Sequence, residues 1–342
     1  IMQPWDEIIA LHFKGVLSIH RNHYVEAYNH QAALVQSFLR IFQNEERNWS
    51  LPMLHTLNRD LRLTGKLADW ECRHKGQKEG KLEDAARILN SCFAACIRDN
   101  SPFEQSKKQG TLHIINNQFK IYFYLNNLQL CKNVIRPVEA KGFPVITSFP
   151  VSQVVTFKFY VGRLAMSEGN FRKAEEELSY AFQHCTDKSE KNKRMILSYL
   201  VPVKLLVGKM PSLELLTKHN FVQFIDLTKA VQSGNLKLFN ETLAKNQDFF
   251  IQKGIYLILE KTKTLTYRNL FKKVYLILQT TKIPLSAFLK AFNWLGIAID
   301  LDEIECIVAN LIYEGYIKGY ISHQQRCLVV SAKNAFPQSW LN

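Results

Sequence analysis

Glycine-rich and metal-ligating motifs are missing from this chain of 342 residues. Its 14 glycines are mostly isolated, so no phosphate-binding loop of the P-loop or dinucleotide type is present. No His-Glu-x-x-His pair occurs, and His20 and His23 have no third ligand at a matching helical spacing. The consecutive residues Glu175–Glu177 point to different sides of a helix and do not form an acid–base pair. The sequence therefore marks no catalytic centre, and we expect neither a cofactor nor a metal.

Paired cysteines and long apolar runs are also missing. The seven cysteines are an odd number and include no Cys-x-x-Cys, so reduced thiols of the cytosol or nucleus are expected. Cys92 and Cys96 lie one helical turn apart, which suits a buried helix face. No segment approaches the ~20 apolar residues of a membrane-spanning helix, and no basic stretch precedes an apolar core near residue 1. These features predict a soluble protein without a signal peptide.

Positive charge is plentiful. Lysine and arginine number 44 against 30 aspartate and glutamate residues, which gives a net charge of +14. The excess is spread along the chain and is not gathered in one arm. Such a field favours acidic partners, either nucleic acid or acidic protein, and does not indicate a reader of base sequence. Ordinary solvated charge is the alternative interpretation.

A short turn pattern occurs four times, beginning at Asn22, Asn126, Gly169 and Gly234. Asparagine and glycine tolerate the left-handed backbone conformation, and each stands between two runs with helical apolar periodicity. The pattern predicts helix–tight turn–helix hairpins. Small residues recur where paired helices must approach closely, at Gly162, Ala165, Ala174 and Ala181.

These hairpins predict a mainly α fold, an irregular α-solenoid similar to tetratricopeptide repeats. A plain helical bundle would also fit the same turns. With 47% hydrophobic residues, the chain can bury a large core, and its length suggests two or three domains. We expect helical repeats over residues 1–150 and 151–262, a distinct module over 263–335 and a tail over 336–342.

The module over 263–335 has the pattern of a winged helix. A helix is predicted over 264–280, with Tyr267, Leu270, Phe271, Val274 and Leu278 facing a core. A short extended link, 282–285, precedes a second helix, and Asp300 or Asp302 begins a third. Two β-type runs, 317–321 and 327–330, then predict a hairpin. Three helices followed by a hairpin are the winged-helix arrangement, a relative of helix-turn-helix.

Charges in this module argue against reading of the DNA major groove. The third helix opens with Asp300, Asp302, Glu303 and Glu305, which would repel phosphates. Basic residues on the first helix and the hairpin would instead hold phosphates without reading bases, with ordinary solvated charges as the alternative. The candidate nucleic-acid contacts are Arg268, Lys272, Lys273, Lys318, His323 and Arg326.

A second basic cluster opens the helix predicted over 189–208. Lys191, Lys193 and Arg194 lie at a helix N-terminus, where positive charge opposes the helix dipole. Local stability gives no reason for them, so they are candidates for binding an acidic partner, with a solvated loop as the alternative. Apolar residues of the hairpin, Ile317, Tyr320 and Val329, are candidates for a seam with a partner.

Several longer strings of the chain resemble those of a known family. The strings are residues 191–204, 208–211, 266–275, 309–313 and 319–323. They resemble the PCI-domain proteins of the nuclear-pore-associated transcription-and-export complex, and the similarity extends over most of the chain from Tyr24 onward. The resemblance implies helical repeats that end in a winged helix.

The resemblance implies a non-catalytic scaffold subunit of a messenger RNA export complex, located in the nucleus at the nuclear pore, with the cytoplasm as a second location. Its implied partners are a large PCI-like scaffold protein, a small acidic disordered protein shared with the proteasome lid, and RNA bound without strong sequence preference. The first alternative is a purely structural subunit of a proteasome-lid-like or signalosome-like assembly. The second is a hydrolase on a helical scaffold, which would need a deep pocket with converging titratable groups.

Overall fold

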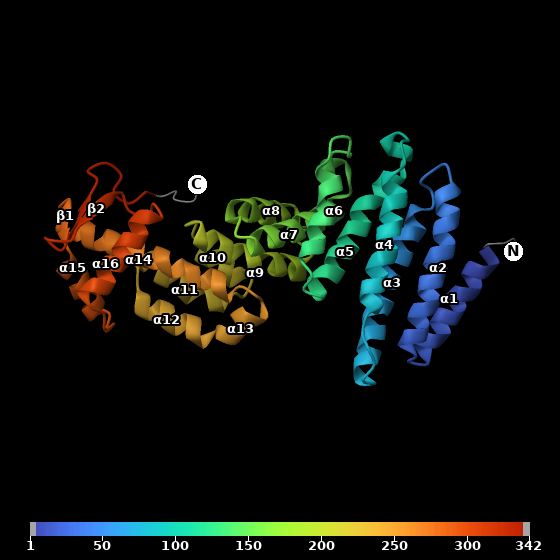
Figure 1. Ribbon diagram of the computed structural model, residues 1–342, viewed down its shortest axis with the longest axis horizontal. Helices are drawn as coiled ribbons and strands as arrows, with labels where there is room; N and C mark the ends of the chain where they lie inside the picture. The colour runs from blue at the N-terminus through green and yellow to red at the C-terminus, as the bar shows by residue number, and fades with distance from the viewer. Residues whose placement is uncertain (1–4, 338–342) are drawn as a thin grey trace. The chain divides into compact units, whose positions relative to one another are not determined.

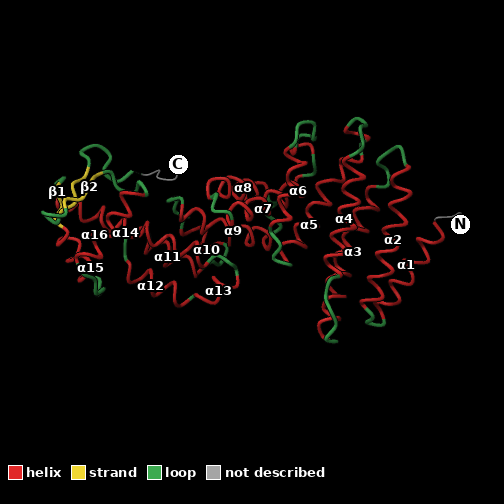
Figure 2. Tube along the Cα trace, viewed as in Figure 1, coloured by secondary structure: helices red, strands yellow, loops and turns green. Residues whose placement is uncertain are grey.

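A computed structural model describes residues 5–337 of the chain. The described residues are mainly helical, with one small sheet near their C-terminal end (Figures 1 and 2). The fold divides after Tyr160 into two compact units, which we call the N-terminal unit and the C-terminal unit. The predicted helical solenoid followed by a winged helix is confirmed.

The N-terminal unit consists of antiparallel helix pairs. Figure 1 shows α1 to α6 following one another in this unit. Its elements are α1 (Trp5–His20), α2 (Tyr24–Asn44), α3 (Leu51–His74), α4 (Lys81–Ile97), η1 (Phe103–Gln105), η2 (Lys107–Gly110), α5 (Thr111–Tyr124), α6 (Gln129–Glu139) and η3 (Ile146–Ser148). Helix α7 (Val151–Ser167) continues through the division between the units.

The C-terminal unit begins with further helix pairs and ends in the mixed module. Its helices are α8 (Phe171–His184), α9 (Glu190–Leu206), α10 (Leu213–Lys218), α11 (Val222–Ser233), α12 (Leu236–Lys245), α13 (Gln247–Gln252), α14 (Tyr256–Leu278), α15 (Leu285–Trp294) and α16 (Leu301–Tyr313). Its strands are β1 (Lys282–Pro284), β2 (Gly319–Ser322) and β3 (Cys327–Val330). None of the helices described within residues 5–337 combines the length and apolarity that crossing a bilayer requires.

All four predicted turns have the predicted backbone. Asn22, Asn126, Gly169 and Gly234 have φ angles of 60°, 55°, 79° and 66°, in the left-handed region. The asparagine after each glycine then caps the next helix: Asn170 accepts from the Lys173 amide and Asn235 from the Leu238 amide. A left-handed residue therefore turns the chain at all four places, and at Gly169 and Gly234 a side-chain cap also follows it.

The segment between α3 and α4 is held by a buried carboxylate. Asp69 lies in α3, yet it accepts hydrogen bonds from the backbone amides of Gly80, Lys81 and Leu82 at 2.8–3.0 Å. These are amides of the first turn of α4, which have no partner within that helix. On the exposed side, Arg73 pairs with both oxygens of Glu79. The polar segment 73–81 is therefore anchored at both of its ends.

The C-terminal module is a winged helix, but its sheet has three strands. The segment predicted as an extended link is β1, which pairs with β3 through Lys282 and Val329, giving the order β1-β3-β2. The prediction of a two-stranded hairpin is therefore incomplete, because a three-residue strand leaves no periodicity to detect. Asp300 caps α16 by accepting from the Glu303 amide at 2.7 Å, as predicted.

Helix α14 joins the repeats to the winged helix. On one side it meets α11, where the side-chain amide of Asn269 donates a hydrogen bond to the Val231 carbonyl at 2.7 Å. On the other side Phe271 lies 4.3 Å from Phe288, ring centroid to centroid, in the core of the module. Leu278, predicted to face this core, is exposed instead, because α14 ends there.

Gly234 fits against α14 with no room for a side chain. A Cβ there would lie 2.5 Å from the backbone nitrogen of Leu270, and the φ of 66° already disfavours any other residue. We expect Gly234→Ala to lower the melting temperature of the C-terminal unit by about 10 °C, from several kcal/mol of clash and strain.

Gly254→Ala is the matched control. Its φ of 68° imposes the same backbone strain, but no atom of the described residues lies within 4 Å of its Cβ position, so the loss should be only about 1 kcal/mol. Thermal unfolding followed by circular dichroism compares the two variants. Equal destabilisation would show that the close approach of Gly234 to α14 does not constrain the fold.

Candidate partner and nucleic-acid interface

Arg268 is not part of an exposed basic face. Its exposed fraction is only 6%, and its guanidinium donates to the carbonyls of Phe336 and Pro337 at 2.7 and 3.0 Å. It also donates to the Asn269 side chain and lies over the Phe336 ring. The prediction that Arg268 contacts nucleic acid is therefore wrong. Its role is to hold the segment after β3 against α14, a contact between residues too far apart in sequence for periodicity to reveal.

The other predicted lysines of the module keep their accessibility. On α14, Lys273 is exposed and Lys272 half-buried, and Lys318 is exposed just before β2. Among the described residues, no ion pair involves these three side chains. They are the part of the predicted basic face that can meet an anion.

The basic residues of the β2–β3 hairpin, the wing of the module, lie against the acidic start of α16. His323 Nδ1 lies 2.8 Å from a carboxylate oxygen of Glu305, and the Arg326 guanidinium lies 3.6 Å from that of Asp302. Both basic side chains are more than half exposed, so these contacts contribute little to stability. Asp302 nevertheless offsets the positive charge of Arg326. The α16 carboxylates thus complement the wing as well as the helix dipole.

The basic cluster on α9 has local partners. Lys193 forms an ion pair with Asp187 and lies over the Phe182 ring, and this pairing lowers the pKa of the Asp187 carboxyl. Arg194 lies over the Phe221 ring and donates to the Asn220 carbonyl at 3.4 Å. Local structure therefore does give a reason for both cations, and the expectation that it gives none is wrong. Lys191 is exposed at the start of α9.

The predicted apolar seam is only partly exposed. Ile317 is buried in the module, so its assignment to a partner contact is wrong. Tyr320 and Val329 are opposite each other on β2 and β3, and opposite residues share one face of a sheet. Tyr320 is 62% exposed and Val329 half-buried. A two-residue apolar spot remains on the outer face of the sheet.

Larger exposed apolar side chains lie where sequence patterns carry no signal. Ile277, near the end of α14, is 79% exposed, while Trp294 and Tyr313, the last residues of α15 and α16, are 85% and 92% exposed. Helical periodicity alone does not identify them, because side chains beyond the packed length of a helix lose their core contacts. Exposed aromatic residues of this size are typical of protein interfaces.

Charged side chains line two clefts of the N-terminal unit. One cleft of 640 Å³ is lined by Arg40, Glu45, Glu46 and Arg47, and one of 480 Å³ by Glu83, Arg87 and Tyr122. In a further cleft of 640 Å³ the titratable side chain is His55. Within residues 5–337, no three or more His, Cys, Asp or Glu side chains are grouped to hold a metal. Burial raises the pKa of the Cys92 thiol to about 12, which suppresses its nucleophilic thiolate.

The contacts of Arg268 predict a structural phenotype. Replacing it with alanine leaves the Phe336 and Pro337 carbonyls without their donor, at a cost of about 2 kcal/mol. We expect Arg268→Ala to lower the melting temperature of the C-terminal unit by about 4–8 °C. The control Lys273→Ala, on the exposed side of the same helix, should change it by less than about 2 °C. A stable Arg268→Ala protein would contradict the anchoring role.

Comparisons with known proteins agree with this architecture. The PCI domain family matches residues 243–332. PCI domain-containing protein 2 of Xenopus laevis is 50% identical over 98% of this chain and 84% of its own length. That of Danio rerio is 48% identical over the same shares. The homolog of Dictyostelium discoideum is 44% identical over 100% of this chain and 81% of its own length. The chain belongs to the PCI domain-containing protein 2 family.

Proposed function

We propose that this protein is a non-catalytic scaffold subunit of a messenger RNA export complex that acts at the nuclear pore. In this proposal its winged helix docks against a second, larger PCI-like scaffold protein. A small acidic disordered protein of the kind found in the proteasome lid binds beside it. RNA is the third partner, held through its phosphates and without strong sequence preference.

The observation that carries the docking role is the set of exposed apolar side chains on the module. Each of the three helices of the module ends at or near an exposed apolar side chain. These are Ile277, Trp294 and Tyr313. The Tyr320 and Val329 pair adds a fourth on the sheet. Aromatic residues such as Trp294 and Tyr313 are among the types enriched at protein interfaces. A protein partner that covers them gains the burial that the chain alone lacks.

The RNA role depends on a smaller set of cations than the sequence indicated. Lys272, Lys273 and Lys318 are accessible on α14 and before β2. His323 and Arg326 are accessible but partly neutralised by Glu305 and Asp302. Few phosphate contacts imply weak, salt-sensitive binding by the isolated module. The alternative, a structural subunit of a lid-like assembly, would not bind RNA at all.

Removing the exposed aromatic residues tests the docking role. We expect Trp294→Ala combined with Tyr313→Ala to weaken binding to the larger PCI-like scaffold by about tenfold or more, because buried aromatic residues dominate interface energies. Isothermal titration calorimetry with purified partners measures the effect. Phe13→Ala is the control, since Phe13 is 67% exposed on α1 of the other unit. Undiminished affinity in the double variant would rule out this docking face.

Reversing two accessible lysines tests the RNA role of the module. Lys273→Glu with Lys318→Glu should weaken binding of a single-stranded RNA oligonucleotide and lower the salt slope of log K by about 1.4, at roughly 0.7 for each phosphate that is no longer neutralised. The control is Lys237→Glu with Lys245→Glu. These two lysines are on α12, outside residues 263–335 of the module, and their reversal makes the same change of net charge.

In cells, the first pair should also cause polyadenylated RNA to accumulate in nuclei. Equal behaviour of the two pairs in both assays would favour the purely structural alternative.

A further inference from the structure

Two rows of polar residues face each other on α3 and α5 of the N-terminal unit. On α3 the row is His55, Arg59, Arg62 and Lys66, at spacings of four, three and four residues. On α5 it is His113, Asn117, Lys120 and Tyr124, at the same spacings. Such spacings place residues on one face of a helix. Each helix therefore presents a single line of side chains about 16 Å long, at 1.5 Å per residue.

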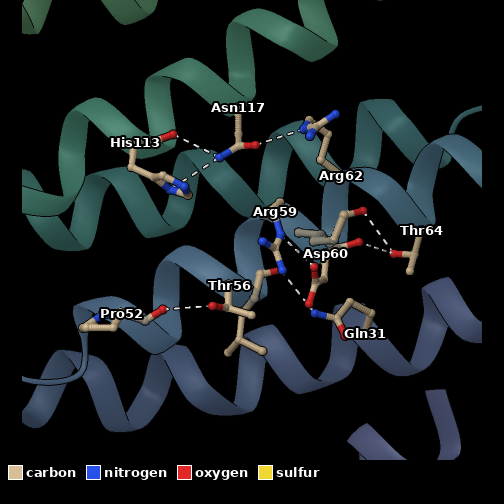
Figure 3. A network of polar contacts seen from close by, with 11 residues as sticks. Gln31, Pro52, Thr56, Arg59, Asp60, Arg62, Thr64, His113 and Asn117 are labelled. Atoms are coloured by element: carbon tan, nitrogen blue, oxygen red, sulfur yellow. Dashed lines mark hydrogen bonds and ion pairs between the residues drawn. The ribbon is translucent and has the colours of Figure 1, made fainter. Parts of the chain in front are cut away.

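The two rows meet side chain to side chain, and Figure 3 shows one of their contacts, between Arg62 and Asn117. The rings of His55 and His113 are stacked with centroids 4.2 Å apart. Arg62 Nε donates to the Asn117 side-chain oxygen at 2.9 Å, and the Lys66 ammonium lies 4.8 Å from the Tyr124 ring centroid. Contacts advance along both helices together, so α3 and α5 run in the same direction here. We call His55, Arg59, Arg62, Lys66, His113 and Lys120 the basic stripe.

The basic stripe has very little opposing charge. Helix α5 contains no aspartate or glutamate. Of the three carboxylates in α3, Asp69 caps α4 and Glu71 pairs with Lys75. The remaining one, Asp60, lies 3.2 Å from Arg59. Along this face a single carboxylate therefore accompanies three arginine and lysine residues of α3 and Lys120 of α5.

The crowding has an electrostatic cost. Burial lowers the pKa of His113 to about 3, with further contributions from His55, Lys120, Arg59 and Arg62. Burial, then the charge of Arg62, lowers the pKa of Lys120. The His113 imidazole is therefore neutral at pH 7, and the like charges crowded in this partly desolvated place are those of the arginine and lysine side chains, which destabilise the fold. On α3 and α5 the one carboxylate that offsets this cost is Asp60, and a bound polyanion would offset it further.

The surroundings of the basic stripe favour nucleic acid over an acidic peptide. Tyr124 ends the α5 row and is half exposed, and Leu63 and Leu67 are exposed next to the α3 row. Aromatic and apolar groups interleaved with cations are typical of surfaces that stack bases while they hold phosphates. The arginines are also well suited to phosphate, because their guanidinium offers paired donors.

We propose that the basic stripe is a second nucleic-acid site, which binds the phosphate backbone of single-stranded RNA with a base stacked on Tyr124. Arg59, Arg62, Lys66 and Lys120 contact phosphates, and the stacked histidines form one end of the site. The site lies wholly within the N-terminal unit. It is independent of the winged helix and of the lysines on which the RNA role of that module depends.

The test uses the full chain and a fluorescently labelled oligouridylate, with anisotropy measured over a series of salt concentrations. Lys66→Glu with Lys120→Glu changes two side chains that reach the surface and that no hydrogen bond within residues 5–337 ties to the fold. We expect affinity to fall about tenfold or more and the salt slope of log K to decrease by about 1.4. Tyr124→Ala should weaken binding severalfold and leave the salt slope unchanged, because it removes stacking and no charge.

The control is Lys14→Glu with Lys78→Glu, two exposed lysines of the same unit outside the basic stripe. It makes the same change in net charge, so its salt slope should match the unaltered protein. Equal weakening in the control and in the stripe variant would overturn the proposal, since only the general field would then matter. Weakening confined to Lys273→Glu with Lys318→Glu would overturn it and leave the role of the winged helix intact.

An acidic protein segment is the competing occupant. A labelled oligoglutamate of matched charge is titrated against the same variants. We expect it to bind more weakly than RNA and to be indifferent to Tyr124→Ala. Tighter binding of the oligoglutamate than of RNA, abolished in Lys66→Glu with Lys120→Glu, would overturn the proposal in favour of a protein partner.

Discussion

The C-terminal unit depends on one helix that packs in two layers at once. Helix α14 meets α11 where Gly234 leaves space for its backbone, and the Asn269 side chain bonds to the Val231 carbonyl. Close by on the same helix, the Phe271 ring packs against the Phe288 ring inside the winged helix. Two faces of α14 are committed to packing, and the accessible Lys272 and Lys273 lie outside them. This constraint turns Arg268 inward, to the Phe336 and Pro337 carbonyls.

The same constraint separates the charge that stabilises the fold from the charge that can meet a partner. In the C-terminal unit some cations are matched, Arg268 with backbone carbonyls and Lys193 with Asp187, while Lys272, Lys273 and Lys318 form no ion pair among the described residues. In the described N-terminal unit the basic stripe is paired with one carboxylate, Asp60, and Arg62 also donates to the Asn117 side chain. Net charge alone does not distinguish the two cases, because each cation contributes equally to +14. Burial and partners decide which cations attract a polyanion.

Local features of the fold were predictable from the sequence. The left-handed turns at Asn22, Asn126, Gly169 and Gly234 and the cap at Asp300 follow from the chemistry of single residues. Contacts between distant segments were not. Strand β1 is defined by pairing with residues more than forty positions later. The basic stripe likewise exists only because α3 and α5 lie together across an intervening helix.

The candidate site was harder to predict for the same reason. The sequence identifies Lys273 and Lys318 as basic, and they are accessible, but it identifies Arg268 and Ile317 equally and both are buried. Trp294 and Tyr313 are the last residues of amphipathic helices, and both lie beyond the part of the helix that packs in the core. Exposure at helix ends depends on where neighbouring elements stop, which no local pattern encodes.

RNA contact with helices α3 and α5, in addition to the winged helix, is the central claim. Ultraviolet cross-linking of the full chain to an oligouridylate, followed by mass spectrometry of the attached peptides, tests it most directly. We expect cross-links in the peptide containing Tyr124 and in the part of α3 that carries Arg59 to Lys66. Cross-links confined to α14 and the β2–β3 hairpin, with none on α3 or α5, would contradict it.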